Sequence, residues 1–200
     1  NMQQTWYFLR HGALIQSGVL SGRTDLALSE LGIEQLHAKT KTLTDIDRIF
    51  SSPLQRCRQF ATTLSCRWQI PLSITDSLQE MDFGAWDGKS FEWLWSNTHN
   101  PSIGDFWQNP WLYTPPEAET MEAFYTRIQQ WWHAQLATPN DSCNLVITHG
   151  GVIKQLLALI LAFPKHDTRQ QSLFDVGYGA MIKVQVYYDE QGIAWPKVVF

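Results

Sequence analysis

Two short apolar segments of this sequence each lead into a histidine followed by glycine. Residues 5–9, TWYFL, precede the triplet RHG that contains His11, and residues 143–148, CNLVIT, precede the triplet HGG that begins with His149. Such apolar runs are typical of buried strands, and a glycine after them allows the chain to turn sharply away. Ligands bind at the carboxyl ends of strands in α/β sheets. We therefore expect His11 and His149 to lie at one ligand-binding edge of a sheet.

The rest of the chain alternates strand patterns with helix patterns. Ser29 is a candidate N-cap and Pro53 a candidate first-turn residue, because serine caps helix ends and proline fits a first turn. The alternation predicts a three-layer αβα sandwich around a mainly parallel sheet, built by residues 1–200 as one domain. Further strands are expected at 47–52, 72–74, 179–188 and 194–200, and helices at about 29–43, 53–68, 119–136 and 152–163.

The middle of the chain departs from this alternation. Residues 84–109 contain four tryptophans, and three prolines follow at positions 110, 115 and 116. Because proline interrupts helices, only short helices are expected there. We expect residues from about 85 to 140 to form a cap-like insertion over one end of the sheet.

Charge and cysteine content limit the classes of partner. The net charge is −4 and no basic run appears, so nucleic acid is not expected as a partner. Three cysteines without metal-ligand spacing predict free thiols in a cytoplasmic protein, and the first residues lack the features of a signal peptide. The longest apolar stretch, residues 152–163, contains Lys154 and is too short to span a bilayer, so no membrane partner is expected.

A set of residues at or after predicted strand ends suits phosphate chemistry: Arg10, His11, Arg56, Glu80 and His149. An unprotonated nitrogen of His11 can attack phosphorus and form a phosphohistidine. Arg10 and Arg56 would hold the phosphoryl oxygens, and His149 would add positive charge or a hydrogen-bond donor. Glu80 would protonate the leaving alkoxide and then take a proton from the hydrolytic water. No metal and no other cofactor is expected, because the cationic side chains supply the positive charge.

The residues after His149 add backbone groups that attract an anion. A helix N-terminus presents free N–H groups and a partial positive charge, and Gly150 allows a ligand to approach the backbone closely. Asp82 is a rival to Glu80 for the role of general acid.

Five blocks of this sequence resemble, in order, the motifs of the histidine phosphatase superfamily, whose fold is phosphoglycerate-mutase-like. The resemblance implies phosphoryl transfer through His11, with Glu80 as proton donor and the two arginines and His149 as the phosphate pocket. The blocks are LRHG at 9–12, SGRTDLALS at 21–29 with Gly32 and Gln35, SSPLQR at 51–56 with Ala61, LQEMDFGAWDG at 78–88, and THGGV at 148–152.

The resemblance also suggests where substrate binds. It places Ser21 and Gly22 on the substrate side, and Arg23 beside them is a candidate contact. Residues 13–17, ALIQS, depart from the pattern, because members usually carry an acidic residue, then Thr or Ser, and soon afterwards an Asn that touches the phosphate. Either the phosphate loses one ligand here, or Gln16 or Ser17 replaces it.

The segment beyond Glu80 resembles the superfamily members that act on α-ribazole 5′-phosphate. Seven of the ten tryptophans lie between Trp86 and Trp132. Any of these that face the pocket would stack on an aromatic base of the substrate. The alternative is that these tryptophans pack in the core. The expected partner is a small phosphomonoester, and a homodimer is left open. Three alternatives remain: a cofactor-dependent phosphoglycerate mutase, a broad-specificity sugar-phosphate phosphatase, and an inactive member that only binds phosphate ligands.

Overall fold

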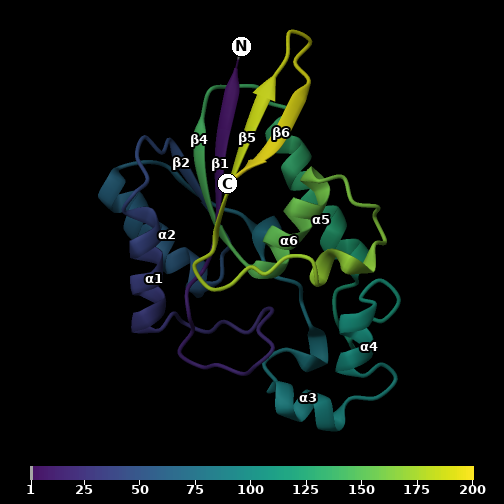
Figure 1. Ribbon diagram of the computed structural model, residues 1–200. Helices are drawn as coiled ribbons and strands as arrows, with labels where there is room; N and C mark the ends of the chain where they lie inside the picture. Colours follow the sequence, from purple (N-terminus) through teal and green to yellow (C-terminus); the bar gives the residue numbers. More distant parts are fainter. Residues whose placement is uncertain (1) are drawn as a thin grey trace.

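A six-stranded mixed sheet forms the centre of the protein (Figure 1). The computed structural model describes residues 2–200, without the side chain of Gln171. The strand order is β3-β2-β4-β1-β5-β6; the first four strands in this order run parallel, and β5 is antiparallel to both of its neighbours, β1 and β6. This confirms the expected mainly parallel sheet. The strands are β1 (Gln3–Arg10), β2 (Arg48–Ser51), β3 (Leu72–Ile74), β4 (Cys143–Thr148), β5 (Met181–Tyr188) and β6 (Ala194–Val199).

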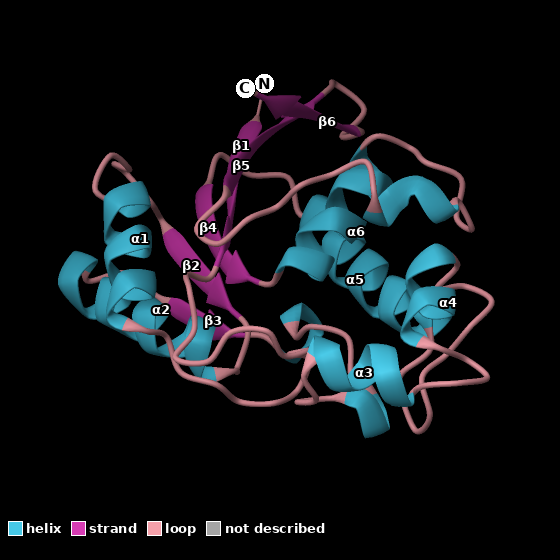
Figure 2. Ribbon diagram, turned by 60° about the horizontal axis from the view of Figure 1, so that its bottom comes forward, coloured by secondary structure: helices cyan, strands magenta, loops and turns pink. Residues whose placement is uncertain are grey.

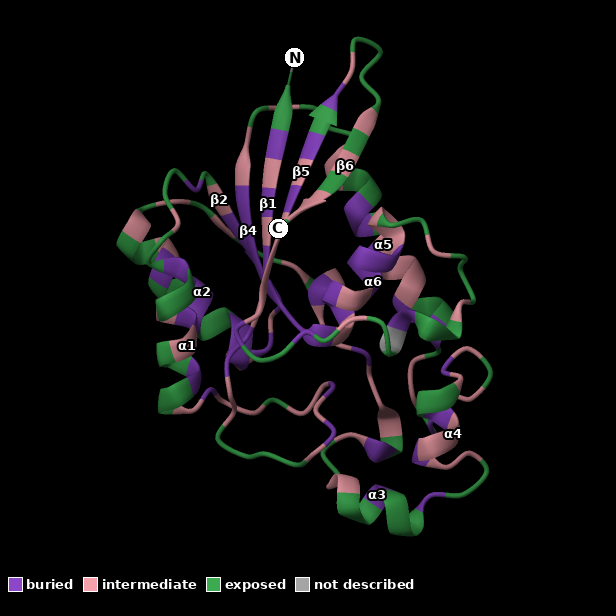
Figure 3. Ribbon diagram, viewed as in Figure 1, coloured by how far each residue is buried: buried purple, intermediate pink, exposed green. Residues whose placement is uncertain are grey.

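Helices cover both faces of this sheet (Figure 2), so the expected three-layer architecture is confirmed. Trp6 and Phe8 of β1 belong to the apolar cluster on the α5 and α6 side, whereas Leu9 belongs to the cluster on the α1 and α2 side. Both faces of β1 are thus buried, and Figure 3 shows buried residues along the middle of β1 and β4. The covering helices are α1 (Glu30–Thr40) and α2 (Gln55–Trp68) on one face, and α5 (Met121–Leu136) and α6 (Gly150–Ile160) on the other.

Short elements occupy the tryptophan-rich segment, as the prolines predicted. Ser102 and Asp105 form a capping box at α4, which satisfies backbone N–H groups at the start of this one- to two-turn helix. The role of residues 85–140 as a cap over the sheet stays a prediction. The short elements are the 3₁₀ helices η1 (Asp76–Leu78) and η2 (Gly84–Trp86), the helices α3 (Phe91–Asn97) and α4 (Ile103–Gln108), and later η3 (Thr168–Gln171).

Two helix starts differ from the sequence-based expectation. Helix α2 begins at Gln55 rather than at Pro53, with Leu54 in the N-cap position. Helix α6 begins at Gly150, whereas the apolar pattern predicted a start at position 152. The first two residues of the helix are glycines, which adopt the helical conformation here despite their weak helix propensity. Its N-cap is therefore His149, which places that side chain at the positive end of the helix.

Gly12 is required for a different reason than the sharp turn that its position suggested. Its φ is not in the left-handed region, but a Cβ at this position would lie 2.2 Å from the carbonyl oxygen of Gly32. A Cβ on Gly32 would in turn lie 2.1 Å from the carbonyl oxygen of Ala13. The two glycines therefore let the segment after β1 pack directly on α1, which begins with Ser29 as the predicted N-cap.

This close packing predicts the effect of Gly32→Ala. Alanine would favour the helix by up to about 1 kcal/mol, but the backbone clash should dominate, and overpacking of this kind costs about 1–3 kcal/mol. The free energy of unfolding in urea should therefore fall. Gly177→Ala is the matched control, because a Cβ at position 177 would have no neighbouring atom within 4 Å. Equal stability of the two variants would contradict the packing account.

Candidate active site

His11 follows β1 directly and is buried. Its Nδ1 lies 2.9 Å from the carbonyl oxygen of Gly12, so Nδ1–H donates there and Nε2 keeps its lone pair. Burial, and next the positive charge of Arg10, lower the pKa of His11 to about 3. The imidazole is therefore neutral near pH 7, with one nitrogen free for attack on an electrophile.

Arg10 lies beside His11 at the end of β1. Its Nη1 donates to the carbonyl oxygen of Val176 at 2.8 Å, and its guanidinium carbon lies 4.4 Å from the centre of the Tyr178 ring. A Cβ on Gly150 would lie 3.1 Å from Nε of Arg10, so this glycine lets the guanidinium approach the start of α6. Arg10 is thus held by neutral groups and keeps its charge available.

Arg56 reaches the site from α2 and is completely buried. Its Nη1 donates to the carbonyl oxygen of Thr24 at 2.6 Å, and its Nη2 donates to those of Gly22 at 2.7 Å and Ser21 at 3.3 Å. Burial lowers the pKa of Arg56 from its usual value. Backbone carbonyls of one loop, residues 21–24, therefore fix this guanidinium.

Asp87 organises that loop, and no pattern in the sequence indicated this role. Its carboxylate accepts hydrogen bonds from the backbone N–H groups of Arg23 at 2.8 Å and Thr24 at 2.9 Å, and from the Thr24 hydroxyl. Burial alone would raise the pKa of Asp87, but these bonds and one from Phe83 hold the pKa below its ordinary value. Asp87 thus supports Arg56 indirectly, through the carbonyls of the loop.

His149 lies opposite His11, with 5.3 Å between the ring centres. Its Nε2 is 2.8 Å from Oγ of Ser52, which follows β2. Burial, followed by the positive charge of Arg56, holds the pKa of His149 well below its usual value. The imidazole of His149 is therefore neutral near pH 7, with a proton on one ring nitrogen and a lone pair on the other.

Three buried nitrogen atoms of this group have no hydrogen-bond partner among the described residues: Nε of Arg10, Nε of Arg56 and Nδ1 of His149. Buried polar atoms in proteins are nearly always paired. Both arginines also act electrostatically on His11. The arrangement therefore suits an anion with several acceptor oxygens, bound beside His11.

Glu80 is placed by the start of α6. Its Oε2 accepts a hydrogen bond from the backbone N–H of Gly151 at 3.0 Å, and a Cβ on Gly151 would lie 2.3 Å from Oε1. Glycine at position 151 therefore makes room for the carboxylate. Asp82, its rival in the sequence, accepts from the backbone N–H of Gly84 at 2.9 Å and does not line the cavity described below.

Arg127 of α5 fixes the backbone that carries Glu80, and sequence reasoning missed it as well. Its Nη1 donates to the carbonyl oxygens of Ser77 and Gln79 at 2.7 and 2.8 Å, and its Nη2 donates to that of Glu80 at 3.0 Å. Nε of Arg127 also pairs with Glu119 at 2.8 Å. The charge of Arg127 is thus used structurally, to hold the segment before η2.

A cavity of about 680 Å³ opens beside Glu80 and Arg10. Gly150 and Gly151 form part of its wall at the same end, and Lys154 lines it one helical turn further along α6. Four further polar residues line the cavity: Gln108, Thr168, Arg169 and Ser172. The apolar part of its wall includes Phe83, Phe106, Trp107, Pro110, Met121 and Phe124.

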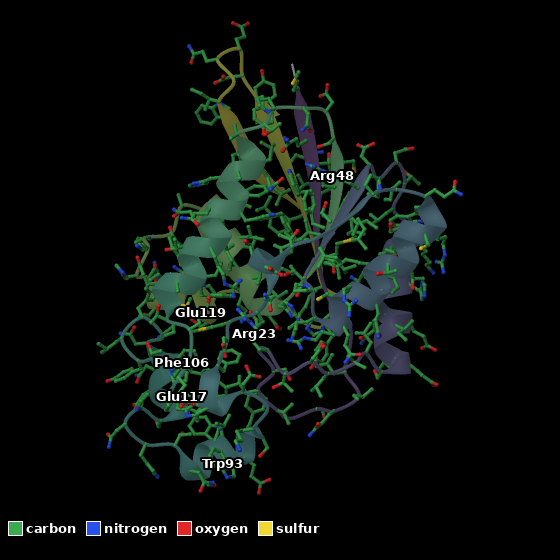
Figure 4. The ribbon with its side chains drawn as sticks, turned by 180° about the vertical axis from the view of Figure 1, so that it is seen from behind. Arg23, Arg48, Trp93, Phe106, Glu117 and Glu119 are labelled. Carbon is green, nitrogen blue, oxygen red and sulfur yellow. The ribbon has the colours of Figure 1, made fainter. Side chains whose placement is uncertain are left out.

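Three of the seven tryptophans that the sequence singled out, Trp86, Trp131 and Trp132, belong to the core, and Trp93, Trp95 and Trp107 are exposed. Trp131 and Trp132 pack edge-on against Trp6, with ring centres 5.8 and 5.4 Å apart, and Trp86 is buried. Trp107 lines the cavity, while Trp93 of α3 does not, and it lies well below Phe106 in Figure 4.

The residues expected on the substrate side lie in two kinds of position. Gly150 lines the cavity, whereas Ser17, Ser21, Gly22 and Arg23 do not. Ser17 is exposed, as is Gln16 before it, and Ser21 and Gly22 present their carbonyl groups to the guanidinium of α2.

Arg23 is directed toward the backbone of the Glu80 segment. Its Nε donates to the carbonyl oxygen of Glu80 at 3.2 Å, and Nη2 lies 4.0 Å from Oε1 of Glu119. Figure 4 shows Arg23 and Glu119 close together above Phe106. The side chain of Arg23 therefore contacts the backbone of Glu80 and the carboxylate of Glu119.

Two kinds of feature are absent from the described residues. They contain no group of three or more His, Cys, Asp or Glu side chains placed to hold a metal ion. Within the same residues, no helix has both the length and the apolar character needed to cross a membrane.

Comparisons with known proteins agree with this geometry. A phosphatase of Salmonella typhimurium named for adenosylcobalamin and α-ribazole is 30% identical over 169 residues, 79% of this chain and 80% of that protein. A Hydrogenobacter thermophilus protein with the provisional name phosphoserine phosphatase 2 is 29% identical over 158 residues, 77% of each chain. In fold, the chain is similar to a mycobacterial glucosyl-3-phosphoglycerate phosphatase, with a TM-score of 0.83 at 20% identity over 98% of this chain and 97% of the other. Residues 6–195 match the histidine phosphatase superfamily (branch 1). The chain therefore belongs to this superfamily and is a phosphatase.

Proposed function

We propose that the protein hydrolyses phosphomonoesters through a phosphohistidine at His11. The observation that carries this proposal is the neutral imidazole, with its free Nε2, beside three unpartnered buried nitrogen atoms. In the first step Nε2 bonds to phosphorus while the bond from phosphorus to the ester oxygen breaks. The N–H groups of Arg10, Arg56 and His149 stabilise the charge on the phosphoryl oxygens.

Glu80 transfers the protons in both steps. Its carboxylic acid protonates the departing alkoxide, which leaves into the adjoining cavity as the alcohol. The resulting carboxylate then takes a proton from water as the water oxygen attacks phosphorus. The bond from phosphorus to Nε2 breaks, and His11 and inorganic phosphate are released.

Glu80→Gln tests this proton transfer. Loss of a general acid should lower kcat for an alkyl phosphate by about 10²–10⁴-fold. The loss of phosphorylation rate with p-nitrophenyl phosphate should be much smaller, because nitrophenolate leaves without a proton. Steady-state and burst kinetics on both substrates measure the difference. Asp82→Asn is the control and should affect both substrates equally; equal losses for Glu80→Gln would remove Glu80 from this role.

The low pKa of His11 predicts that acid destabilises the fold. Between about pH 6.5 and 3 the unfolded chain binds a proton at this histidine that the folded protein does not bind. The free energy of unfolding should therefore decrease as the pH falls through this range, by up to about 1.4 kcal/mol per pH unit for one histidine. Urea unfolding at pH 7 and pH 5 should show a smaller decrease for His11→Asn than for the wild type. The same decrease in both proteins would contradict a neutral buried His11.

For the substrate, we propose α-ribazole 5′-phosphate. The cavity volume is in the range of small-molecule sites, and its aromatic wall suits a flat apolar base. The name of the Salmonella relative gives the same substrate class, whereas the names of the other two relatives give phosphoserine and glucosyl-3-phosphoglycerate. The aromatic lining favours the first of these three.

A panel of these three esters tests the assignment. The value of kcat/KM should be highest for α-ribazole 5′-phosphate. Trp107→Ala should reduce that value and leave the value for phosphoserine nearly unchanged, because only the flat base stacks on the cavity wall. Trp93→Ala is the matched control, since both tryptophans are 43% exposed and Trp93 does not line the cavity.

The same panel separates the other interpretations. Preference for a phosphorylated sugar acid, or no effect of Trp107→Ala, would contradict the proposed substrate. A requirement for a bisphosphorylated primer would indicate a mutase. Binding of the esters without formation of phosphohistidine would indicate an inactive member and contradict the proposed reaction itself.

A further inference from the structure

Ser52 is placed to control which nitrogen of His149 carries the proton. Its Oγ lies 2.8 Å from Nε2 of His149 and 3.4 Å from the backbone N of Leu54. Cys57 is the other neighbour of this nitrogen, with Sγ at 3.8 Å. All three side chains are buried, so these protons have few alternative partners.

The donors and acceptors around Ser52 favour one direction for its contact with His149. The backbone N–H of Leu54 donates to Oγ of Ser52, so the hydroxyl proton of Ser52 remains for one of two acceptors, Nε2 of His149 or Sγ of Cys57. The single proton of Cys57 has an acceptor in the carbonyl oxygen of Thr148, 3.6 Å from Sγ. The remaining short contact joins the Ser52 hydroxyl to Nε2 of His149. A neutral ring that accepts at Nε2 carries its proton on Nδ1.

We propose that Ser52 is a positioning residue that holds His149 in the tautomer with its proton on Nδ1. Nδ1 is the ring atom that has no partner among residues 2–200. In this tautomer it offers an N–H to a phosphoryl oxygen, whereas in the other tautomer it would turn a lone pair toward negatively charged oxygen. Ser52 thereby decides whether His149 attracts or repels the phosphoryl group. The catalytic consequence rests on the proposed reaction, but the tautomer itself does not.

The tautomer can be measured without substrate. In ¹⁵N spectra of histidine-labelled protein, the resonances of His149 are identified by their loss in His149→Asn. The wild type and Ser52→Thr should show a protonated Nδ1 and an unprotonated Nε2, and Ser52→Ala should lose this preference. Ser51→Ala is the matched control, because that buried serine donates only to the carbonyl oxygen of Ser52 at 2.8 Å. A protonated Nε2 in the wild-type protein would overturn the proposal, whether or not the variants fold.

Kinetics test the consequence for the reaction. With p-nitrophenyl phosphate, Ser52→Ala should lower kcat and kcat/KM together by roughly 10- to 100-fold. The upper value equals the smallest loss that is typical when a direct hydrogen-bond donor to an oxyanion is removed. Ser52→Thr should recover most of this loss, and Ser51→Ala should stay near wild type. In the His149→Asn background, Ser52→Ala should cause no additional loss, because it acts through His149. The same loss in both backgrounds would contradict the proposal.

The two sets of measurements separate this inference from the proposed function. An enzyme that forms no phosphohistidine would defeat the proposed reaction, yet the ¹⁵N spectra would still report the tautomer. Conversely, a wild-type protein that forms phosphohistidine with Nε2 of His149 protonated would defeat this inference alone.

Discussion

The register of three neighbouring parallel strands determines where the reactive groups lie. β1 pairs with β4 so that Arg10 lies opposite Thr148, and β2 pairs with β4 so that Ser51 lies opposite Ile147. The next residue of each strand is therefore a site residue: His11, His149 and Ser52. Backbone hydrogen bonds from His11 to Thr148 and from Ser52 to Ile147, both at 3.1 Å, continue this pairing to the end of the sheet. A shift of one residue would turn each side chain to the other face.

Backbone groups hold the charged side chains of the site, which leaves their charges for the ligand. Carbonyl oxygens hold Arg56 and Arg10, and the N–H of Gly151 holds the carboxylate of Glu80. The side chains of Arg127 and Arg23 instead contact Glu119. We infer that such local placement of positive charge lets a protein with a net charge of −4 attract an anion.

The sequence predicted the parts of this structure that depend on local pattern. Apolar runs that end in His-Gly marked the ends of β1 and β4, and strand–helix alternation predicted the layers. The lowered pKa of His149 could not be predicted, because burial causes it, and burial depends on packing between distant segments. The same is true of Asp87 and Arg127. Apart from near neighbours in sequence, the partners of Asp87 lie 63 or more residues away, and those of Arg127 lie 47 or more residues away.

Formation of a phosphoenzyme tests the central claim most directly. The enzyme is mixed with excess p-nitrophenyl phosphate, quenched in alkali to preserve a phosphorus–nitrogen bond, and analysed by peptide mass spectrometry and ³¹P NMR. We expect one phosphoryl group per chain, on Nε2 of His11. A phosphoryl group on another residue, or a burst of nitrophenolate without any phosphohistidine, would contradict a nucleophilic role for His11.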